Sequence, residues 1–195
     1  MKVILGLGNP GREYALTRHN LGWWVLDHVA RVWEFDAWRH DGDALVASGS
    51  VGPIKVRLVK PQTYMNLSGA ALRPYTRRPT WTPSSDLLVV VDDVALPLGR
   101  FRLRASGSSG GHNGLRSIES ALQSREYPRL RIGIERRDDR RRAGSLADFV
   151  LDTFDADERA FILARMPTLT DAIEQVVRDG IAAAMNTFNT RDESC

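Results

Sequence analysis

Residues 6–20 of the chain read GLGNPGREYALTRHN, and the rest of the sequence is organised around this stretch. An apolar run before it predicts a short buried strand over residues 2–7, and apolar residues at helical spacing after it predict a helix whose N-cap is Asn20. A strand and a helix can be joined by far fewer residues. The long polar connection therefore predicts a functional loop at a strand end. Its candidate side chains are Asn9, Tyr14, Arg18 and His19.

Residues 6–11 also match the G-x-G-x-x-G pattern of dinucleotide-binding loops. In such loops the helix begins on the glycine turn and points its N-terminal amides at a pyrophosphate. Here Pro10 removes one N–H donor, and the apolar helix begins well after the turn. The acidic residues available to bind a ribose, Glu34 and Asp36, follow that helix instead of a second strand. We therefore keep a dinucleotide site as the weaker interpretation and favour a catalytic loop whose base is His19.

The remaining sequence alternates between predicted strands and predicted helices. Short apolar or strictly alternating runs predict strands, and apolar residues at helical spacing predict helices. The expected strands cover residues 44–51, 54–60, 87–91, 100–104 and 129–134, and the first two form a hairpin. Further helices are expected over residues 115–123, 157–166 and 168–185. The last two are separated, or joined by a kink, at Pro167. Residues 135–145 form a charge run, which predicts a solvated, mobile loop, and residues 186–195 predict a frayed tail. The pattern predicts a single-domain, three-layer α/β/α sandwich over residues 1–195 around a mixed, mostly parallel twisted sheet.

Composition indicates a globular protein without a membrane span. Hydrophobic residues make up 43% of the chain, which is enough for a core. No apolar run approaches the ~20 residues of a spanning helix, and the N-terminal apolar run is too short for a signal peptide. Cys195 is the sole cysteine, which argues against disulfides, cysteine metal sites and a cysteine nucleophile. We expect a cytoplasmic protein.

Polar loops follow several predicted strands, and such loops can gather at one edge of an α/β sheet. They are residues 9–19, 64–66 and 106–113, and Asp92 follows a further strand. Serine catalysis on an α/β sheet would need a G-x-S-x-G elbow, which residues 107–110 do not match. Metal catalysis could draw on His19, Asp92 and His112, but their spacing matches no metal motif. The favoured hypothesis is general-base catalysis on water by His19, supported by a carboxylate.

Asparagine and arginine side chains extend this hypothesis toward a substrate. Amides such as those of Asn9 and Asn113 can bind a carbonyl and its developing oxyanion, although Asn-Pro and Asn-Gly pairs also simply favour turns. The glycine-rich loop at residues 106–114 runs into a helix, which is a natural anion cradle. Alternating arginines flank it on two predicted strands, and guanidinium groups suit phosphates. They are Arg100, Arg102, Arg104, Arg129 and Arg131. A substrate with a carbonyl to cleave and a phosphate to bind is therefore expected.

Five motifs occur in order along the chain, and they read GLGNPGREYALTRHNLG, KPQTYMNLSG, VVVDDVALPLG, SGSSGGHNGLRSI and YPRLRIGI. Through these motifs the sequence resembles bacterial peptidyl-tRNA hydrolases, and the resemblance covers the chain up to about residue 189. It implies a monomeric α/β sandwich that cleaves the ester between a peptide and the 3′-terminal ribose of tRNA, and so recycles tRNA from stalled ribosomes. It also implies that no metal or cofactor is needed. The partner would be peptidyl-tRNA, bound through its acceptor stem, 3′ end and 5′-phosphate.

The resemblance assigns roles by position. His19 is expected to be the general base, Asp92 its supporting carboxylate, and Asn9 the residue that distinguishes blocked from unblocked aminoacyl groups. The remaining matches are Tyr14, Tyr64, Asn66 and Asn113 as substrate contacts, Met65 as an apolar wall, and Arg104 with Arg131 as a clamp on the 5′-phosphate. The sequence departs from the family pattern at Val91, often His, and at Ala95, often Asp, while position 104 is often Lys. These departures concern the surroundings of the proposed catalytic pair.

A second class of function is an RNA-binding module, because relatives of this fold are known that serve RNA splicing and have lost hydrolysis. A pure binder has no physical need for His19, Asp92 and Asn9 together. Their joint presence favours the enzyme, and an ester-cleavage assay would discriminate between the two.

Overall fold

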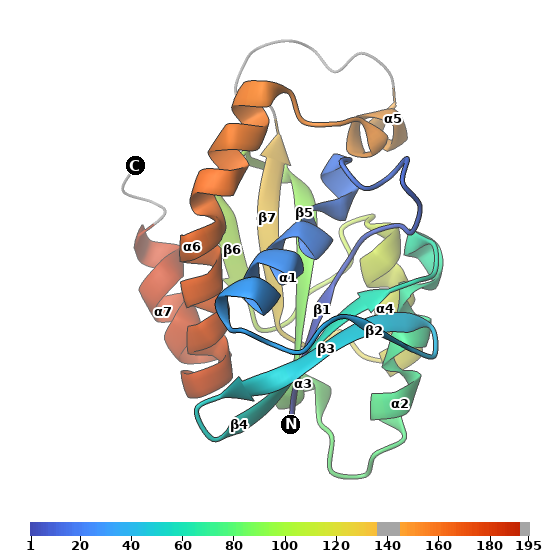
Figure 1. Cartoon of the computed structure of the whole chain (residues 1–195), viewed down its shortest axis with the longest axis vertical. Helices are drawn as coiled ribbons and strands as arrows, with labels where there is room; N and C mark the ends of the chain where they lie inside the picture. The colour runs from blue at the N-terminus through green and yellow to red at the C-terminus, as the bar shows by residue number, and fades with distance from the viewer. Residues whose placement is uncertain (136–144, 192–195) are drawn as a thin grey trace.

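The computed structural model describes residues 1–135 and 145–191, and its centre is a seven-stranded sheet of order β2-β3-β4-β1-β5-β7-β6 (Figure 1). Strands β4, β1, β5 and β7 are parallel neighbours, while β2, β3 and β6 extend the two edges with antiparallel pairing. The bounds are β1 (Lys2–Gly6), β2 (Arg39–Asp41), β3 (Ala44–Val51), β4 (Ile54–Pro61), β5 (Leu87–Pro97), β6 (Phe101–Arg104) and β7 (Arg129–Glu135). The predicted mixed, mostly parallel sheet is confirmed.

Helices cover both faces of this sheet, as Figure 1 shows. One face carries α1 (Leu21–Val32), α6 (Ala156–Asp179) and α7 (Ile181–Arg191), and the other carries η2 (Met65–Leu72), α2 (Arg73–Thr76) and α4 (Asn113–Leu122). Three further short helices, η1 (Arg18–Asn20), α3 (Pro83–Asp86) and α5 (Leu146–Leu151), lie at the ends of the sheet. Because side chains alternate along a strand, Ile4 joins the first core whereas Val3 and Leu5 join the second. The α/β/α layering is thereby confirmed.

The C-terminal helices differ from the prediction. The chain stays helical through Pro167, and the break between α6 and α7 comes at Gly180, whose φ is 86°. Proline removes the hydrogen bond to the carbonyl four residues earlier, here that of Leu163. Leu163 lies on the exposed side of α6, where water can replace the lost donor. The predicted separation at Pro167 is therefore wrong.

The predicted frayed tail is also wrong for residues 186–191, which belong to α7. Phe188 is buried, and the amide of Asn189 both accepts from the backbone N–H of Leu103 and donates to its carbonyl. These contacts pair the helix with the free edge of β6. Residues 192–195, and residues 136–144 of the predicted mobile loop, lie outside the described residues.

Within the described residues, no helix is long and apolar enough to cross a bilayer. His28 of α1 is half-buried, and Arg31 one turn later hydrogen-bonds to its Nδ1. Asp92, expected at a strand end, lies inside β5, just before pairing with β7 shifts register between Asp93 and Pro97. That irregularity lies in the part of β5 that borders the cleft described next.

Candidate functional site

The opening stretch reaches the carboxyl end of the sheet because two glycines let α1 pack directly on β1. A Cβ atom on Gly22 would lie 2.6 Å from backbone atoms of Leu7 and Val90, and one on Gly6 would lie 2.5 Å from the Gly22 carbonyl oxygen. Only residues without a Cβ permit this approach. The helix therefore begins close to β1 and β5, and η1 directly before it carries His19 to the same place.

His19, Asp92 and His112 form one hydrogen-bonded group. His19 Nδ1 lies 3.0 Å from both carboxylate oxygens of Asp92, and His112 Nε2 lies 3.1 Å from Asp92 Oδ1. His112 Nδ1 accepts from the backbone N–H groups of Gly114 and Leu115 at the start of α4, so its ring proton lies on Nε2 and is donated to Asp92. Asp92 also accepts from His19 Nδ1–H, which leaves Nε2 of His19 free to act as a base.

The electrostatics of this group suit a base supported by a carboxylate. Burial alone would lower the pKa of His19, but the charge of Asp92 and its hydrogen bond outweigh burial and raise that pKa above its usual value. Burial would likewise raise the pKa of Asp92, yet attraction to His19 and His112 and their hydrogen bonds hold it well below its usual range. Asp92 is therefore ionised at neutral pH, and it stabilises the imidazolium that forms when His19 accepts a proton.

Asn9 is held beside His19 by contacts that fix its side-chain amide. Its Oδ1 accepts from the backbone N–H of Met65 at 2.7 Å. Its backbone N–H donates to Oδ1 of Asn20, and its carbonyl accepts from Nδ2 of Asn20, both at 2.9 Å. Because the oxygen of the Asn9 amide is used by Met65, its NH₂ group is the donor left for a ligand.

These residues line a cleft of about 460 Å³ at the carboxyl end of the sheet. Its polar side is formed by Asn9, His19, Asp92, His112, Asn113 and Arg131. Apolar side chains also line the cleft, among them Leu146, Val150 and Leu151 from α5. Met65 is another apolar lining residue. The cleft therefore combines a histidine, amide groups and a hydrophobic surface.

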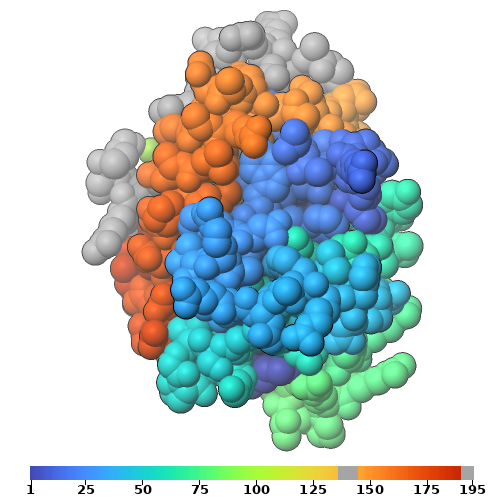
Figure 2. All heavy atoms as spheres, viewed as in Figure 1, coloured from blue at the N-terminus to red at the C-terminus, as the bar shows by residue number. Residues whose placement is uncertain are grey.

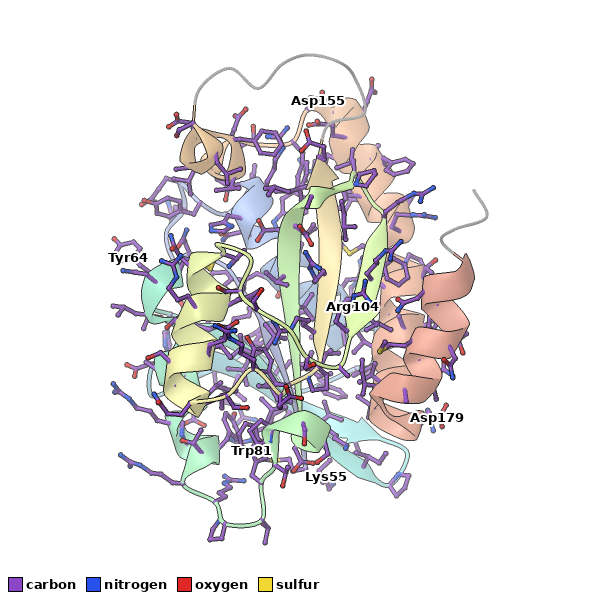
Figure 3. The ribbon with its side chains drawn as sticks, turned by 180° about the vertical axis from the view of Figure 1, so that it is seen from behind. Lys55, Tyr64, Trp81, Arg104, Asp155 and Asp179 are labelled. Atoms are coloured by element: carbon purple, nitrogen blue, oxygen red, sulfur yellow. The ribbon has the colours of Figure 1, made fainter. Side chains whose placement is uncertain are left out.

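Other predicted contacts lie beside this cleft. Asn66 is exposed and lines a groove of about 590 Å³ between η2 and α4, and Asn113 lines both the groove and the cleft. Tyr14 and Tyr64 contact each other edge to face, with ring centroids 6.4 Å apart. Tyr64 is exposed next to η2 (Figure 3). The residues predicted as one site therefore line a cleft and an adjoining groove.

The predicted arginines differ in how far they are exposed. Arg131 lines the cleft and forms an ion pair with Asp93 at 2.6 Å, while Arg104 is exposed on the edge strand β6 (Figure 3). Arg129, expected to approach the anion cradle from the same face, is buried instead. Its guanidinium donates to the carbonyls of Ser108 and Arg125, so it holds the glycine-rich loop in place. Arg129 therefore lies beside the glycine-rich loop as predicted, but it is buried and bound to backbone carbonyls. The sequence did not indicate this burial, because alternation identifies a face and not what covers it.

Some residues of the site were not singled out from the sequence. His112 was considered only as a metal ligand, although a histidine just before a helix start can cap it. Asn20 occupies the predicted N-cap position, but its side chain makes no cap and instead binds the backbone of Asn9. Nothing in the sequence indicates that pairing, since it depends on how the turn folds back.

His19, Asp92 and His112 are also the described residues that could best hold a metal ion, since one ligand atom from each lies within 4.8 Å of the others. In this structure both imidazoles direct an N–H at the carboxylate, at ordinary hydrogen-bond distances. Hydrogen bonds alone therefore satisfy these atoms, and no buried polar atom of the three side chains is left without a partner.

Comparison with known proteins decides the family. The family model described as peptidyl-tRNA hydrolase matches residues 3–194. The chain belongs to the peptidyl-tRNA hydrolase family. A peptidyl-tRNA hydrolase of Gemmatimonas aurantiaca is 58% identical over 96% of this chain and 99% of that protein, and one of Roseiflexus sp. is 46% identical over 97% and 86%.

Solved structures agree with this assignment. A crystal structure of peptidyl-tRNA hydrolase from Acinetobacter baumannii matches with a TM-score of 0.85 at 31% identity, covering 97% of this chain and 94% of that one. The sequence-based resemblance to bacterial peptidyl-tRNA hydrolases is therefore confirmed, as is the fold that it implied. The match spans the sheet, the cleft and the C-terminal helices of this peptidyl-tRNA hydrolase family member.

Proposed function

We propose that the chain hydrolyses the ester bond between the peptide and the 3′-terminal ribose of peptidyl-tRNA, with His19 as general base. Family membership makes the chain an ester hydrolase acting on peptidyl-tRNA. The observation that carries the mechanism is the His19–Asp92 hydrogen bond, which orients the imidazole and raises its pKa. An ester is already activated, so a positioned base and water suffice without a covalent intermediate.

The proposed reaction uses groups of the cleft in order. His19 Nε2 takes a proton from water, and the hydroxide oxygen forms a bond to the ester carbonyl carbon. The amide NH₂ of Asn9 and the side chain of Asn113 donate to the carbonyl oxygen as it becomes an oxyanion. The bond from carbon to the ribose oxygen then breaks, and the imidazolium returns its proton to that oxygen. Asp92 stays ionised throughout.

The two parts of the substrate would occupy different surfaces. The peptide suits the apolar wall formed by Met65 and α5, and the tRNA 3′ end and acceptor stem suit the polar rim with Tyr14, Tyr64 and Asn66. Arg131 lines the cleft, Arg104 is exposed on the neighbouring strand β6, and the two would bind the 5′-phosphate. We also propose that the enzyme acts as a monomer in the cytoplasm, without an obligate protein partner, metal or cofactor.

Replacing His19 by Ala tests the mechanism. We expect kcat to fall by ~10²–10⁴ while tRNA binding persists, because the base acts in the transition state and contributes little to holding the substrate. Cleavage of an N-blocked aminoacyl-tRNA in single turnover, with filter binding of tRNA, measures both quantities. A variant that keeps wild-type turnover would remove His19 from the mechanism. A wild-type protein that binds tRNA without cleaving the ester would instead favour the RNA-binding module.

A further inference from the structure

Arg18, the residue next to His19, is fully buried in the described structure, with a relative exposure of 0%. Its Nη2 lies 2.6 Å from Oε2 of Glu158, and its Nη1 donates to the carbonyl of Thr153 at 2.6 Å. The guanidinium also lies over the rings of Phe149 and Phe154, at 4.7 and 5.1 Å from their centroids. Neither the proposed mechanism nor the family match gives this cation a function.

The partners of Arg18 belong to segments far away in the sequence. Glu158 is in the first turn of α6, where its carboxylate also accepts from the backbone N–H of Asp155 in a capping box. Figure 3 labels Asp155 at the start of this helix. Phe149 is in α5, the helix that forms the apolar wall of the cleft. Backbone pairing adds to this junction, since the N–H of Arg18 donates to the carbonyl of Asp152. Figure 2 shows the opening stretch packed directly against α5 and the start of α6.

A buried cation with this many contacts needs a reason, because removing two charges from water costs free energy that their attraction often fails to repay. An apolar pair of similar volume would hold α5 and α6 against the loop at least as tightly. The ion pair adds a fixed orientation that an apolar pair would lack. A planar guanidinium holds its carboxylate, carbonyl and ring partners in one geometry. Since Arg18 and His19 are adjacent in η1, that geometry also fixes the backbone from which the base projects.

We propose that Arg18 is a positioning residue. Its buried ion pair with Glu158 keeps the general base, His19, and the α5 side of the cleft in fixed positions relative to each other. This inference rests on the proposed role of His19. The pair acts through His19 and the wall and contacts no reacting atom. Its loss displaces the imidazole relative to Asp92 and the peptide-binding surface relative to both.

Replacing Glu158 by Gln tests the proposal with a small change in side-chain shape. The amide oxygen of Gln can still accept from Asp155, so the capping box survives, but the carboxylate closest to Arg18 loses its charge. The anion that remains is Asp152, whose Oδ2 lies 3.6 Å from Nη1 of Arg18 and whose side chain is largely exposed. We expect kcat per folded molecule to fall by ~10-fold, since small displacements of a catalytic group are costly. The acidic limb of the kcat profile should move to lower pH, because a looser hydrogen bond to Asp92 raises the pKa of His19 less. The charged or titratable groups facing His19, Asp92 from β5 and His112 from before α4, are unchanged by this variant.

Two further variants separate geometry from the electric field of the pair. Arg18→Lys keeps the charge but not the planar contacts and should slow kcat similarly. Arg18→Met combined with Glu158→Gln removes both charges. If position matters, this double variant stays slow, and it is no slower than Arg18→Met alone, because the two residues act as one unit. If the double variant instead recovers the wild-type rate and pH profile, only the field mattered and the proposal is overturned.

Asp27→Asn is the matched control. Asp27 faces another buried cation, Lys60, at 2.7 Å, and neither residue lines the cleft. This control should lower the melting temperature without changing kcat per folded molecule or the pH profile. If Glu158→Gln behaves like Asp27→Asn, the Arg18 pair is merely structural and the inference fails. That failure is distinct from a failure of the mechanism, which His19→Ala reports independently.

Discussion

Asp92 hydrogen-bonds to both imidazoles of the site, and its carboxylate accepts from a donor on each ring. His19 Nδ1–H and His112 Nε2–H both point at it, and a carboxylate has acceptor capacity for both. An amide at this position would have one acceptor oxygen, and its NH₂ group would face one of the two rings. If that ring were His19, the imidazole would have to accept through Nδ1, and its proton would then occupy the Nε2 that must act as base.

We predict that Asp92→Asn lowers the maximal kcat by ~10² or more, within the range of general acid–base effects. The pH profile gives the sign of the underlying shift. Wild-type activity is lost as pH falls through the raised pKa of His19, because the protonated ring is no base. Without the carboxylate, burial dominates and lowers that pKa, so the acidic limb should move to lower pH. Measuring kcat/KM from acid to neutral pH checks this, and an acidic limb that stays in place or rises would contradict it.

At the scale of elements, the sequence could predict the strands and most helices, because burial imposes periodicities that local sequence displays. Residues 44–51, for example, form β3 as predicted. Prediction from the sequence failed where contacts between distant segments determine the position or the burial of a residue. Asn189 holds α7 to β6, and Arg129 is covered by the chain around Ser108. The site shows the same division: His19 and Asp92 were identified, whereas Arg18 gave no sign of partners 140 residues away.

The packing of α1 on β1 can be tested with Gly22→Ala. The added Cβ would meet backbone atoms of Leu7 and Val90, which cannot move aside as a side chain can, so we expect a loss of about 1–3 kcal/mol in the free energy of unfolding. Because η1 precedes α1, kcat should fall as well. Gly42→Ala is the control: its φ of 58° strains alanine but nothing lies within 4 Å of the new Cβ, so kcat should persist. Urea denaturation and single-turnover cleavage measure the two effects, and a Gly22→Ala enzyme of normal stability would contradict the packing argument.

At the scale of the whole molecule, positive charge does not accumulate into a large excess. The formal net charge is only +3, although the chain holds 27 basic residues. Many of the described cations are paired, as Arg131 is with Asp93 and Arg57 with Asp41. Such a surface would hold tRNA through a few phosphate contacts near the cleft, and this suits an enzyme that must release tRNA after each turnover. It also means that Asp93 offsets part of the attraction between Arg131 and a phosphate.

The salt dependence of binding tests whether Arg104 and Arg131 contact phosphate. Each phosphate contact releases counterions, so Arg104→Ala or Arg131→Ala should raise KM and reduce the slope of log K against log salt by about 1, with little change in kcat. Asp93→Asn should act in the opposite direction at Arg131, because it removes the anion that competes with the phosphate. Arg178→Ala is the matched control, since Arg178 is an exposed arginine paired with Glu174 on α6. Titrations of labelled tRNA at several salt concentrations give the slopes. Slopes that are the same in wild type, in the Arg104 and Arg131 variants and in the control would show that the phosphate is bound elsewhere.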